Sequence, residues 1–183
     1  MRDRHSNFIG ASRGITAPFA TRETPTGKAS PTVLIRTLAA NRRLAVRNIV
    51  NALFVRDGMV LLARRSPHRT TYPALWSFPG GHVEHHETLT DALIRELREE
   101  VGVIPTLFSF LATILDPHTP ESDPATYHMY AVSAWTGGEP TLLGDEHTEL
   151  RWFPPTAAIA LPDLALEEYR PLFKHLAGMR RRH

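Results

Sequence analysis

Residues 81–103 read GHVEHHETLTDALIRELREEVGV, a glycine-led loop that runs into an acidic helix. The helix carries Glu96, Glu99 and Glu100, which fall within roughly 100° of arc on an ideal α-helix. The adjoining arc is apolar and consists of Leu93, Ile94, Leu97 and Val101. We therefore expect one face of this helix to pack against a core and the neighbouring face to present carboxylates.

The ends and the charges of this helix follow from its sequence. Thr88 with Asp91 three residues later is a capping-box-like start, and Gly102 suits a left-handed terminator. Arg95 lies four residues before Glu99, so it can hold one carboxylate and offset part of the repulsion. The simplest alternative to a cation-binding site is a charged helix face that is only solvated. Because hard divalent cations favour such oxygen donors, we predict Mg²⁺ or Mn²⁺ as the cofactor.

The spacing around the helix decides between these alternatives. Gly81 is followed by five residues and Glu87, and then by seven residues and a dense cluster. The fixed or class-restricted positions are Gly81, Glu87, Arg95, Glu96, Leu97, Glu99, Glu100, Gly102 and Val103. Together they resemble the signature of the Nudix hydrolases, of the MutT-like kind, with no departure at any defined position. A looser similarity extends over residues 47–176.

The resemblance implies an α/β fold, a Nudix-type α/β/α sandwich around a mixed β-sheet. It also implies a bound divalent metal. The implied metal ligands are the carbonyl oxygen of Gly80 and the side chains of Glu96, Glu99 and Glu100. Glu99 and Glu100 would also be catalytic, and Glu87 and Arg95 would orient and support them. The glycine pair that opens the loop would let the backbone approach the ion closely.

Hydrolysis also needs a group that accepts a proton from the attacking water, and a carboxylate outside the helix can serve. Residues 144–149 precede a predicted strand at 150–153. In many Nudix hydrolases a glutamate in this region binds metal or accepts the proton. We favour Glu146 over Glu149 as the base, and two ordinary loop acids are the alternative.

Several further residues are candidates for binding the substrate. Arg64 and Arg65 end the second strand of a predicted hairpin, and an arginine here suits contact with phosphate. Because side chains alternate along a strand, only one of the two should face the site. Gly81 is included among the substrate-binding residues. The aromatic candidates for stacking on a base, for most of which core packing is favoured, are Trp76, Phe78, Tyr127 and Tyr130.

A histidine group precedes the acidic helix and comprises His82, His85 and His86. The metalloprotease pattern fails there, because Thr90 stands where a second histidine is needed. We interpret these histidines as solvent-exposed loop residues, one of which is a candidate for contacting a substrate phosphate.

The resemblance implies a pyrophosphohydrolase that cleaves a nucleoside diphosphate linked to another group. Within that class we favour a nucleoside triphosphate, oxidised forms included, converted to the monophosphate and pyrophosphate. A nucleotide-sugar or ADP-ribose pyrophosphatase and a non-hydrolytic nucleotide-binding Nudix regulator are the alternatives. A diphosphate isomerase of the isopentenyl type drops out, because it relies on a cysteine and the chain has none. An RNA decapping role for the basic N-terminal segment stays open.

Length and composition fit one Nudix domain, since 183 residues with 42% hydrophobic composition can bury a core. The sequence has no apolar run of about 18 residues, so no membrane partner is expected. The absence of cysteine suits a cytoplasmic protein. Residues 1–47 contain nine basic and two acidic residues, a net charge of +7, so residues 48–183 carry a net charge of −5. Because the predicted catalytic domain is acidic, a nucleic-acid partner is not expected. The oligomeric state stays open, a homodimer included.

The chain divides into three predicted segments. These are a flexible basic arm at 1–29, an extra helix and lead-in at 30–46, and the Nudix hydrolase domain at 47–183. Asp57-Gly58 predicts a hairpin turn between strands at 46–55 and 59–63. Further strands are predicted at 106–115 and 127–135. Helices are predicted at 156–161 and 166–177, with Pro171 kinking the second or marking its start.

Overall fold

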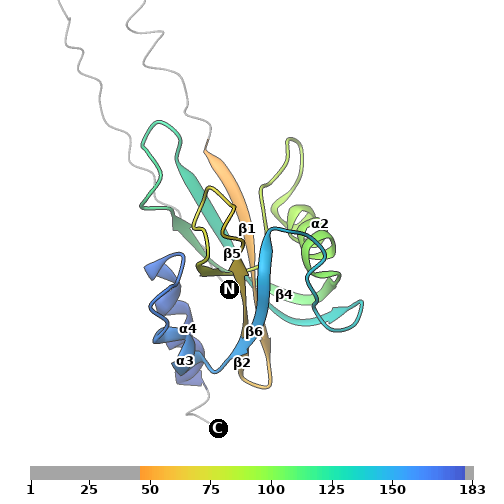
Figure 1. Ribbon diagram of the computed structural model, residues 1–183. Helices are drawn as coiled ribbons and strands as arrows, with labels where there is room; N and C mark the ends of the chain where they lie inside the picture. The colour runs from red at the N-terminus through yellow and green to blue at the C-terminus, as the bar shows by residue number, and fades with distance from the viewer. Residues whose placement is uncertain (1–45, 180–183) are drawn as a thin grey trace, which may run out of the picture. The chain divides into compact units, whose positions relative to one another are not determined.

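The computed structural model describes residues 46–179, which Figure 1 draws in colour. The predicted arm at 1–29 lies outside the described residues, as does the predicted helix at 30–46 apart from Val46. The strands are β1 (Arg47–Arg56), β2 (Met59–Arg65), β3 (Trp76–Ser77), β4 (Ile104–Leu115), β5 (Ala125–Thr136) and β6 (His147–Phe153). The helices are α2 (Leu89–Val101), α3 (Pro155–Ile159), the 3₁₀ helix η1 (Glu167–Tyr169) and α4 (Arg170–Met179).

The strands form one mixed sheet in the order β3-β2-β1-β5-β4, with β6 paired to β2. β1 and β5 run parallel, and the other pairs are antiparallel. β2 pairs with β1 and β3 along one edge and with β6 along the other. Figure 1 shows α2 on one side of the strands and α3 and α4 on the other. The predicted α/β/α arrangement around a mixed sheet is confirmed.

Two apolar cores fill the spaces between these layers. The core on the α4 side includes Leu53, Phe78, Met129, Tyr169 and Phe173. The core on the α2 side includes Val50, Phe54, Leu93, Leu97 and Val101. β1 contributes to both cores, because successive side chains along a strand point to opposite faces. Its unbroken buried run from Ile49 to Phe54 is what a central strand covered on both faces requires.

The hairpin between β1 and β2 forms at the predicted turn. Asp57 and Gly58 have φ values of 51° and 72°, so both central residues are in the left-handed region that a two-residue hairpin requires. Arg56 pairs with Met59 and Val55 with Val60 across this turn. The hairpin prediction is confirmed.

Helix α2 begins and ends where its capping residues predict. The Thr88 hydroxyl accepts a hydrogen bond from the Asp91 N–H at 3.1 Å. Gly102 closes the helix in the left-handed conformation, with φ of 73°, and its N–H donates to the Leu97 carbonyl. The buried face differs in one position from the prediction, because Ala92 is fully buried and Ile94 only partly.

Several element boundaries differ from the predictions. The two-residue strand β3 is not predicted, because it forms only through long-range pairing with Ala63 and Arg64. β6 starts at His147 rather than at residue 150, as its first residues pair with the end of β2. Pro171 lies in the first turn of α4, after η1, so it marks the start of this helix and does not kink it. None of the helices within residues 46–179 is long and apolar enough to cross a membrane.

Candidate active site

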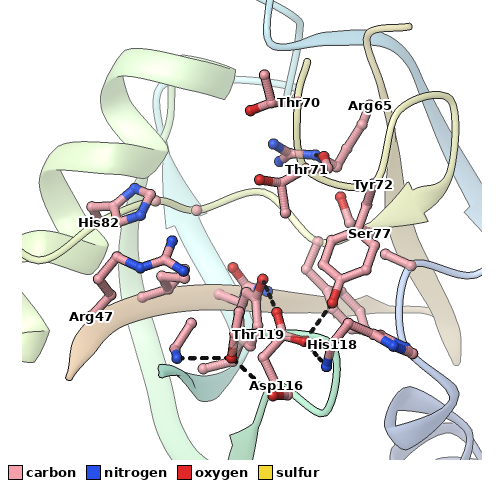
Figure 2. Close-up of a pocket in the computed structure, with 18 of the residues that line it drawn as sticks. Arg47, Arg65, Thr70, Thr71, Tyr72, Ser77, His82, Asp116, His118 and Thr119 are labelled. Carbon is pink, nitrogen blue, oxygen red and sulfur yellow. Dashed lines mark hydrogen bonds between the residues drawn. The ribbon is translucent and has the colours of Figure 1, made fainter. Parts of the chain in front are cut away.

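A cavity of about 340 Å³ opens beside the loop that leads into α2. It is lined by Gly80 and Gly81 from this loop, by Arg65 at the end of β2 and by Glu146 just before β6. Figure 2 shows side chains from several separate segments pointing into it. A second hollow of about 220 Å³ lies against the acidic side of α2, and Glu146 borders it too. The two hollows therefore meet at Glu146.

The loop before α2 brings backbone unusually close to β1. Gly80 has φ of 141°, and a Cβ there would lie 2.0 Å from the Val50 carbonyl oxygen, so only glycine fits. The Gly80 N–H donates to Glu100 Oε2 at 2.8 Å. The loop thus connects the central strand to the end of the acidic helix.

Gly81 makes room for a carboxylate. A Cβ on Gly81 would lie 2.4 Å from the Glu96 carboxyl carbon, much closer than two carbon atoms approach in van der Waals contact. Gly81 also lines the cavity, as its predicted substrate-binding role requires. The structure therefore adds a second reason for glycine here, which is the position of Glu96.

Replacing Gly81 with alanine is expected to displace the Glu96 carboxylate and to lower kcat/KM by about tenfold or more. The fold should survive, because the atoms that collide belong to the far end of a flexible side chain. Gly178→Ala is the matched control, since a Cβ at Gly178 meets nothing within 4 Å. Steady-state kinetics at several Mg²⁺ concentrations test this, and equal activity of both variants would contradict it.

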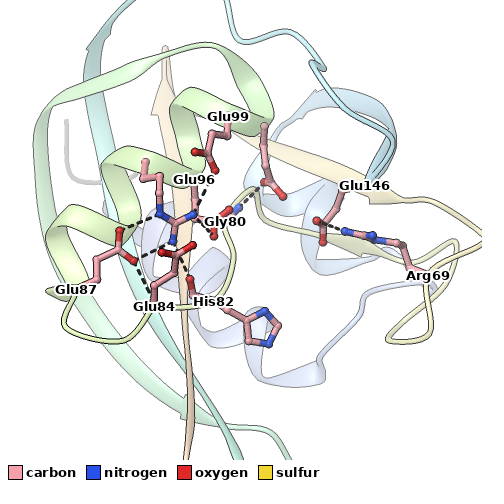
Figure 3. Close-up of polar contacts among 10 residues, drawn as sticks. Arg69, Gly80, His82, Glu84, Glu87, Glu96, Glu99 and Glu146 are labelled. Atoms are coloured by element: carbon pink, nitrogen blue, oxygen red, sulfur yellow. Dashed lines mark hydrogen bonds and ion pairs between the residues drawn. The ribbon is translucent and has the colours of Figure 1, made fainter.

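Arg95 is the centre of the polar network on α2, and its partners Glu87, Glu96 and Glu99 are labelled in Figure 3. It donates to both carboxylate oxygens of Glu87 at 2.9 Å, to Glu96 at 2.8 Å and to Glu99 at 3.3 Å. A further bond at 2.9 Å reaches the His82 carbonyl oxygen. The predicted contact with Glu99 is present, but Glu87 and Glu96 lie closer. The hydrogen bond from Arg95 lowers the pKa of Glu87. Arg95 and Glu87 therefore fix the loop and Glu96 relative to the helix.

Arg95→Ala is expected to lower activity by about 10- to 100-fold and to raise the Mg²⁺ concentration that gives half-maximal rate. The reason is that Glu96 and Glu87 lose the donors that hold their carboxylates in place. Arg98, which is exposed on the same helix, supplies the control, and Arg98→Ala should stay within about twofold of wild type. Similar losses in both variants would show that activity depends only on the positive charge of α2 and not on the contacts of Arg95.

Glu100 is the most constrained of the three helix carboxylates. One oxygen accepts from the Gly80 N–H, while Oε1 is buried and has no hydrogen-bond donor. Burial first, and then the charges of Glu146 and Glu96, raise the pKa of Glu100 to about 8. The helix face carries the predicted carboxylates, but the loop at residue 80 covers Glu100, and only 14% of the Glu96 side chain is exposed. Glu99 matches the prediction, with 55% of its side chain exposed.

Glu146 faces these acids from the segment before β6. Arg65 Nη1 donates to it at 3.0 Å, and Arg69 forms a second ion pair with its other oxygen. Burial alone would raise the pKa of Glu146, but the two arginines outweigh burial and lower it. Arg69 was missed in the sequence. It is the one arginine between β2 and β3, and this could have marked it as a partner for an acid.

The remaining candidates are also placed by the structure. Arg65 lines the cavity, whereas Arg64 pairs with Asp163 at 3.4 Å and lies over the Trp76 ring, so one arginine faces the site as expected. Glu149 lies within β6 and pairs with Arg151 rather than with the acids of α2. Of the aromatic candidates, Phe78 and Tyr127 line the cavity and belong to the core, while Trp76 and Tyr130 are core residues only. His82, His85 and His86 are exposed, and His82 reaches the cavity rim.

The side chains around the second hollow suit a hard divalent cation. All the acidic donors are carboxylate oxygens, which Mg²⁺ and Mn²⁺ prefer. The unpaired, buried Oε1 of Glu100 beside another carboxylate needs either a proton or a cation. Within residues 46–179, no three His, Asp or Glu side chains are already grouped as metal ligands. Ion pairs explain this, because Glu99 is held by Arg95 and Glu146 by Arg65 and Arg69.

Comparison with known proteins identifies the family. The family model described as NUDIX domain matches residues 45–176. The chain belongs to the Nudix family. It is a Nudix hydrolase, which acts on phosphoanhydride bonds. The Nudix signature predicted from residues 81–103 is therefore the loop and helix described above.

Individual relatives agree with this assignment. The Nudix chain is 38% identical over 116 residues to a CTP pyrophosphohydrolase of Escherichia coli (strain K12), covering 62% of this chain and 80% of the relative. It is 45% identical over 56 residues to nucleoside triphosphatase NudI of Escherichia fergusonii, a match of 31% of this chain and 40% of that protein. The crystal structure of a MutT Nudix hydrolase from Burkholderia pseudomallei is similar with a TM-score of 0.60 and 28% identity, covering 70% and 95% of the two chains.

Proposed function

We propose that this Nudix hydrolase is a divalent-metal-dependent pyrophosphohydrolase that converts a nucleoside triphosphate to the monophosphate and pyrophosphate. The observation that carries this proposal is the unpaired Oε1 of Glu100, buried beside Glu146 at the point where the two hollows meet. A bound cation would stabilise this buried, unpaired carboxylate oxygen. A divalent cation held by carboxylates typically also binds the phosphates of a substrate. The names of the CTP pyrophosphohydrolase and of NudI support a nucleoside triphosphate.

The residues that would hold the cation are the side chains of Glu96, Glu99 and Glu100 and the carbonyl oxygen of Gly80. When bound, a divalent cation neutralises charge on the phosphates and polarises the phosphorus centre. Glu146 borders the same hollow and would become a further oxygen donor or a base once its arginines engage the substrate.

Arg65 and Arg69 are the proposed phosphate-binding residues. Each presents a guanidinium to the Glu146 carboxylate, and a triphosphate offers the same kind of paired oxygens with more charge. A substrate that takes these donors leaves the Glu146 carboxylate free to accept a proton. Arg65 keeps its orientation during this exchange, because its Nε also donates to the Thr71 carbonyl oxygen at 2.8 Å.

Glu146 is the proposed base. The lowered pKa of Glu146 means that it is a carboxylate at neutral pH. In the step, the oxygen of a water molecule forms a bond to one phosphorus of the anhydride, and the bond from that phosphorus to the bridging oxygen breaks. One proton of the water passes to a carboxylate oxygen of Glu146, and the departing phosphate group keeps the electron pair.

A substrate panel tests this function. The full chain is incubated with each common nucleoside triphosphate, ADP-ribose and a nucleotide sugar, with Mg²⁺, with Mn²⁺ or with a chelator. We expect a nucleoside monophosphate and pyrophosphate from a triphosphate, and no turnover in the chelator. Tight nucleotide binding without cleavage of any substrate would replace the proposal with a non-hydrolytic regulator. Faster cleavage of ADP-ribose or the sugar would reassign the substrate.

A further inference from the structure

The cavity contains a buried carboxylate that the proposed hydrolysis does not use. Asp116 follows β4, lines the cavity and is only 3% exposed. In Figure 2, its carboxylate and the Arg65 guanidinium lie on opposite sides of the cavity. If the phosphates occupy the Arg65 side, Asp116 meets the other end of the bound nucleotide.

The hydrogen bonds to Asp116 are unevenly distributed. Oδ1 accepts from the Tyr72 hydroxyl at 2.6 Å and from the His118 N–H at 2.9 Å. Oδ2 accepts only from the Tyr127 hydroxyl, at 3.3 Å. Because a carboxylate offers about four lone-pair sites, Oδ2 has acceptor capacity left, and Asp116 lines the cavity. A ligand that donates to this carboxylate adds a charge-assisted hydrogen bond, which is stronger than one between neutral groups.

The two tyrosines that contact Asp116 are hydrogen-bond donors to it. Burial first, and then the hydrogen bond to Asp116, raise the pKa of Tyr72. Burial also raises the pKa of Tyr127 to about 12. Both phenols therefore keep their protons at neutral pH and donate to the carboxylate. Phe78 and Tyr127 add aromatic walls to the cavity, which suits a flat ring beside the carboxylate.

We propose that Asp116 determines which base the enzyme accepts, by taking a hydrogen bond from an exocyclic amino group of cytosine or adenine. This inference rests on the proposed hydrolysis of nucleoside triphosphates. Cytosine donates from its 4-amino group, whereas uracil carries a carbonyl oxygen at the same position. Two acceptors would then face each other, and UTP should be a poorer substrate than CTP although the two have the same sugar, phosphates and size.

A purely structural role for Asp116 is the competing explanation. The bonds from Tyr72 and His118 brace the loop after β4, and both involve Oδ1. Loss of such a brace would destabilise the protein and lower kcat/KM by the same factor for every substrate. Discrimination between CTP and UTP depends instead on the free site of Oδ2, so the ratio of their kcat/KM values separates the two roles.

The experiment compares kcat/KM for CTP and UTP in wild type, Asp116→Asn and Glu121→Gln. Wild type should favour CTP by about tenfold or more, as expected for a hydrogen bond to a charged acceptor. Asparagine keeps one oxygen for Tyr72 and presents an N–H₂ group in place of Oδ2, so the ratio should fall by about tenfold or more. Glu121 is exposed in the same loop, and Glu121→Gln removes the same charge without changing the ratio.

Binding of CMP and UMP to wild-type protein, measured by calorimetry, needs neither a folded variant nor turnover. CMP should bind more tightly. Equal CMP and UMP affinities, or a CTP-to-UTP ratio that Asp116→Asn leaves unchanged, would overturn the assignment of Asp116. If the protein cleaves neither CTP nor UTP but binds CMP more tightly than UMP, the proposed hydrolysis is overturned and the base selection by Asp116 stands.

Discussion

Glu100→Gln is expected to remove most of the turnover while making the metal-free protein more stable. The activity loss follows because Glu100 is a proposed cation ligand with a buried, unpaired Oε1, and its carboxyl group lies near Glu146. An amide supplies one weak oxygen and no charge, and kcat/KM should fall by about 10²- to 10⁴-fold. The Gly80 N–H keeps an acceptor in the amide oxygen, so the fold is retained.

The stability gain depends on pH. The pKa of Glu100 is about 8 in the folded protein, above its ordinary value of about 4.3 in an unfolded chain. Between these values the folded state binds more protons, so the stability of wild type falls as pH rises through this window. Glutamine resembles the protonated acid and avoids this fall. The expected gain in unfolding free energy is on the order of 5 kcal/mol at pH 8.5 and below about 1 kcal/mol at pH 4.5.

Urea unfolding in the presence of a chelator, at several pH values, measures this gain. Glu168→Gln is the control, because Glu168 is exposed and lies away from the acids of α2. Added Mg²⁺ should stabilise wild type more than the Glu100 variant, since a ligand stabilises the state that binds it. A loss of stability in Glu100→Gln at high pH, or equal stabilisation of both proteins by Mg²⁺, would contradict the proposed role of this residue.

Glu146→Gln is expected to lower kcat by about 10²- to 10⁴-fold, the usual contribution of a general base. KM should rise little, because Arg65 and Arg69 remain available for the phosphates. The acidic limb of the pH profile of kcat/KM, which reports protonation of the base, should also disappear. Steady-state kinetics over a range of pH measure both effects.

Glu149→Gln is the matched control for this variant. Glu149 lies three residues further along and pairs with Arg151 on β6. Its replacement should leave kcat within about twofold of wild type. If the two variants exchanged these outcomes, the base would be Glu149. If neither lost activity, another group or the bulk solvent would accept the proton.

The parts of the fold that the sequence predicts are those that depend on near neighbours. Thr88 caps α2 through Asp91, and the hairpin depends on Asp57 and Gly58, so each signal lies within a few residues. The order of strands and the parallel pairing of β1 with β5 were not predicted from pattern. They depend on contacts between segments far apart in the chain, which local periodicity does not encode.

The same distinction applies to the site. The acids of α2 and their arginine are close in sequence and were predicted together, along with the region of Glu146. The pairing of Glu146 with Arg69 joins residues 77 positions apart, and Tyr72 reaches Asp116 across 44 positions. No short sequence motif predicts contacts between residues so far apart in the chain. The burial of Glu100 was missed for the same reason, because it depends on how the loop at residue 80 lies against β1.

The parallel pairing of β1 with β5 also affects how the enzyme is made. β1 leaves the ribosome before its neighbour β5, which is synthesised only after α2 and β4, and β6 follows later still. The acidic helix therefore exists in the nascent chain before Glu146 and the last strand have been translated. Non-local pairings of this kind slow folding, and hydrolytic activity should arise only after β6 has been synthesised and has paired with β2.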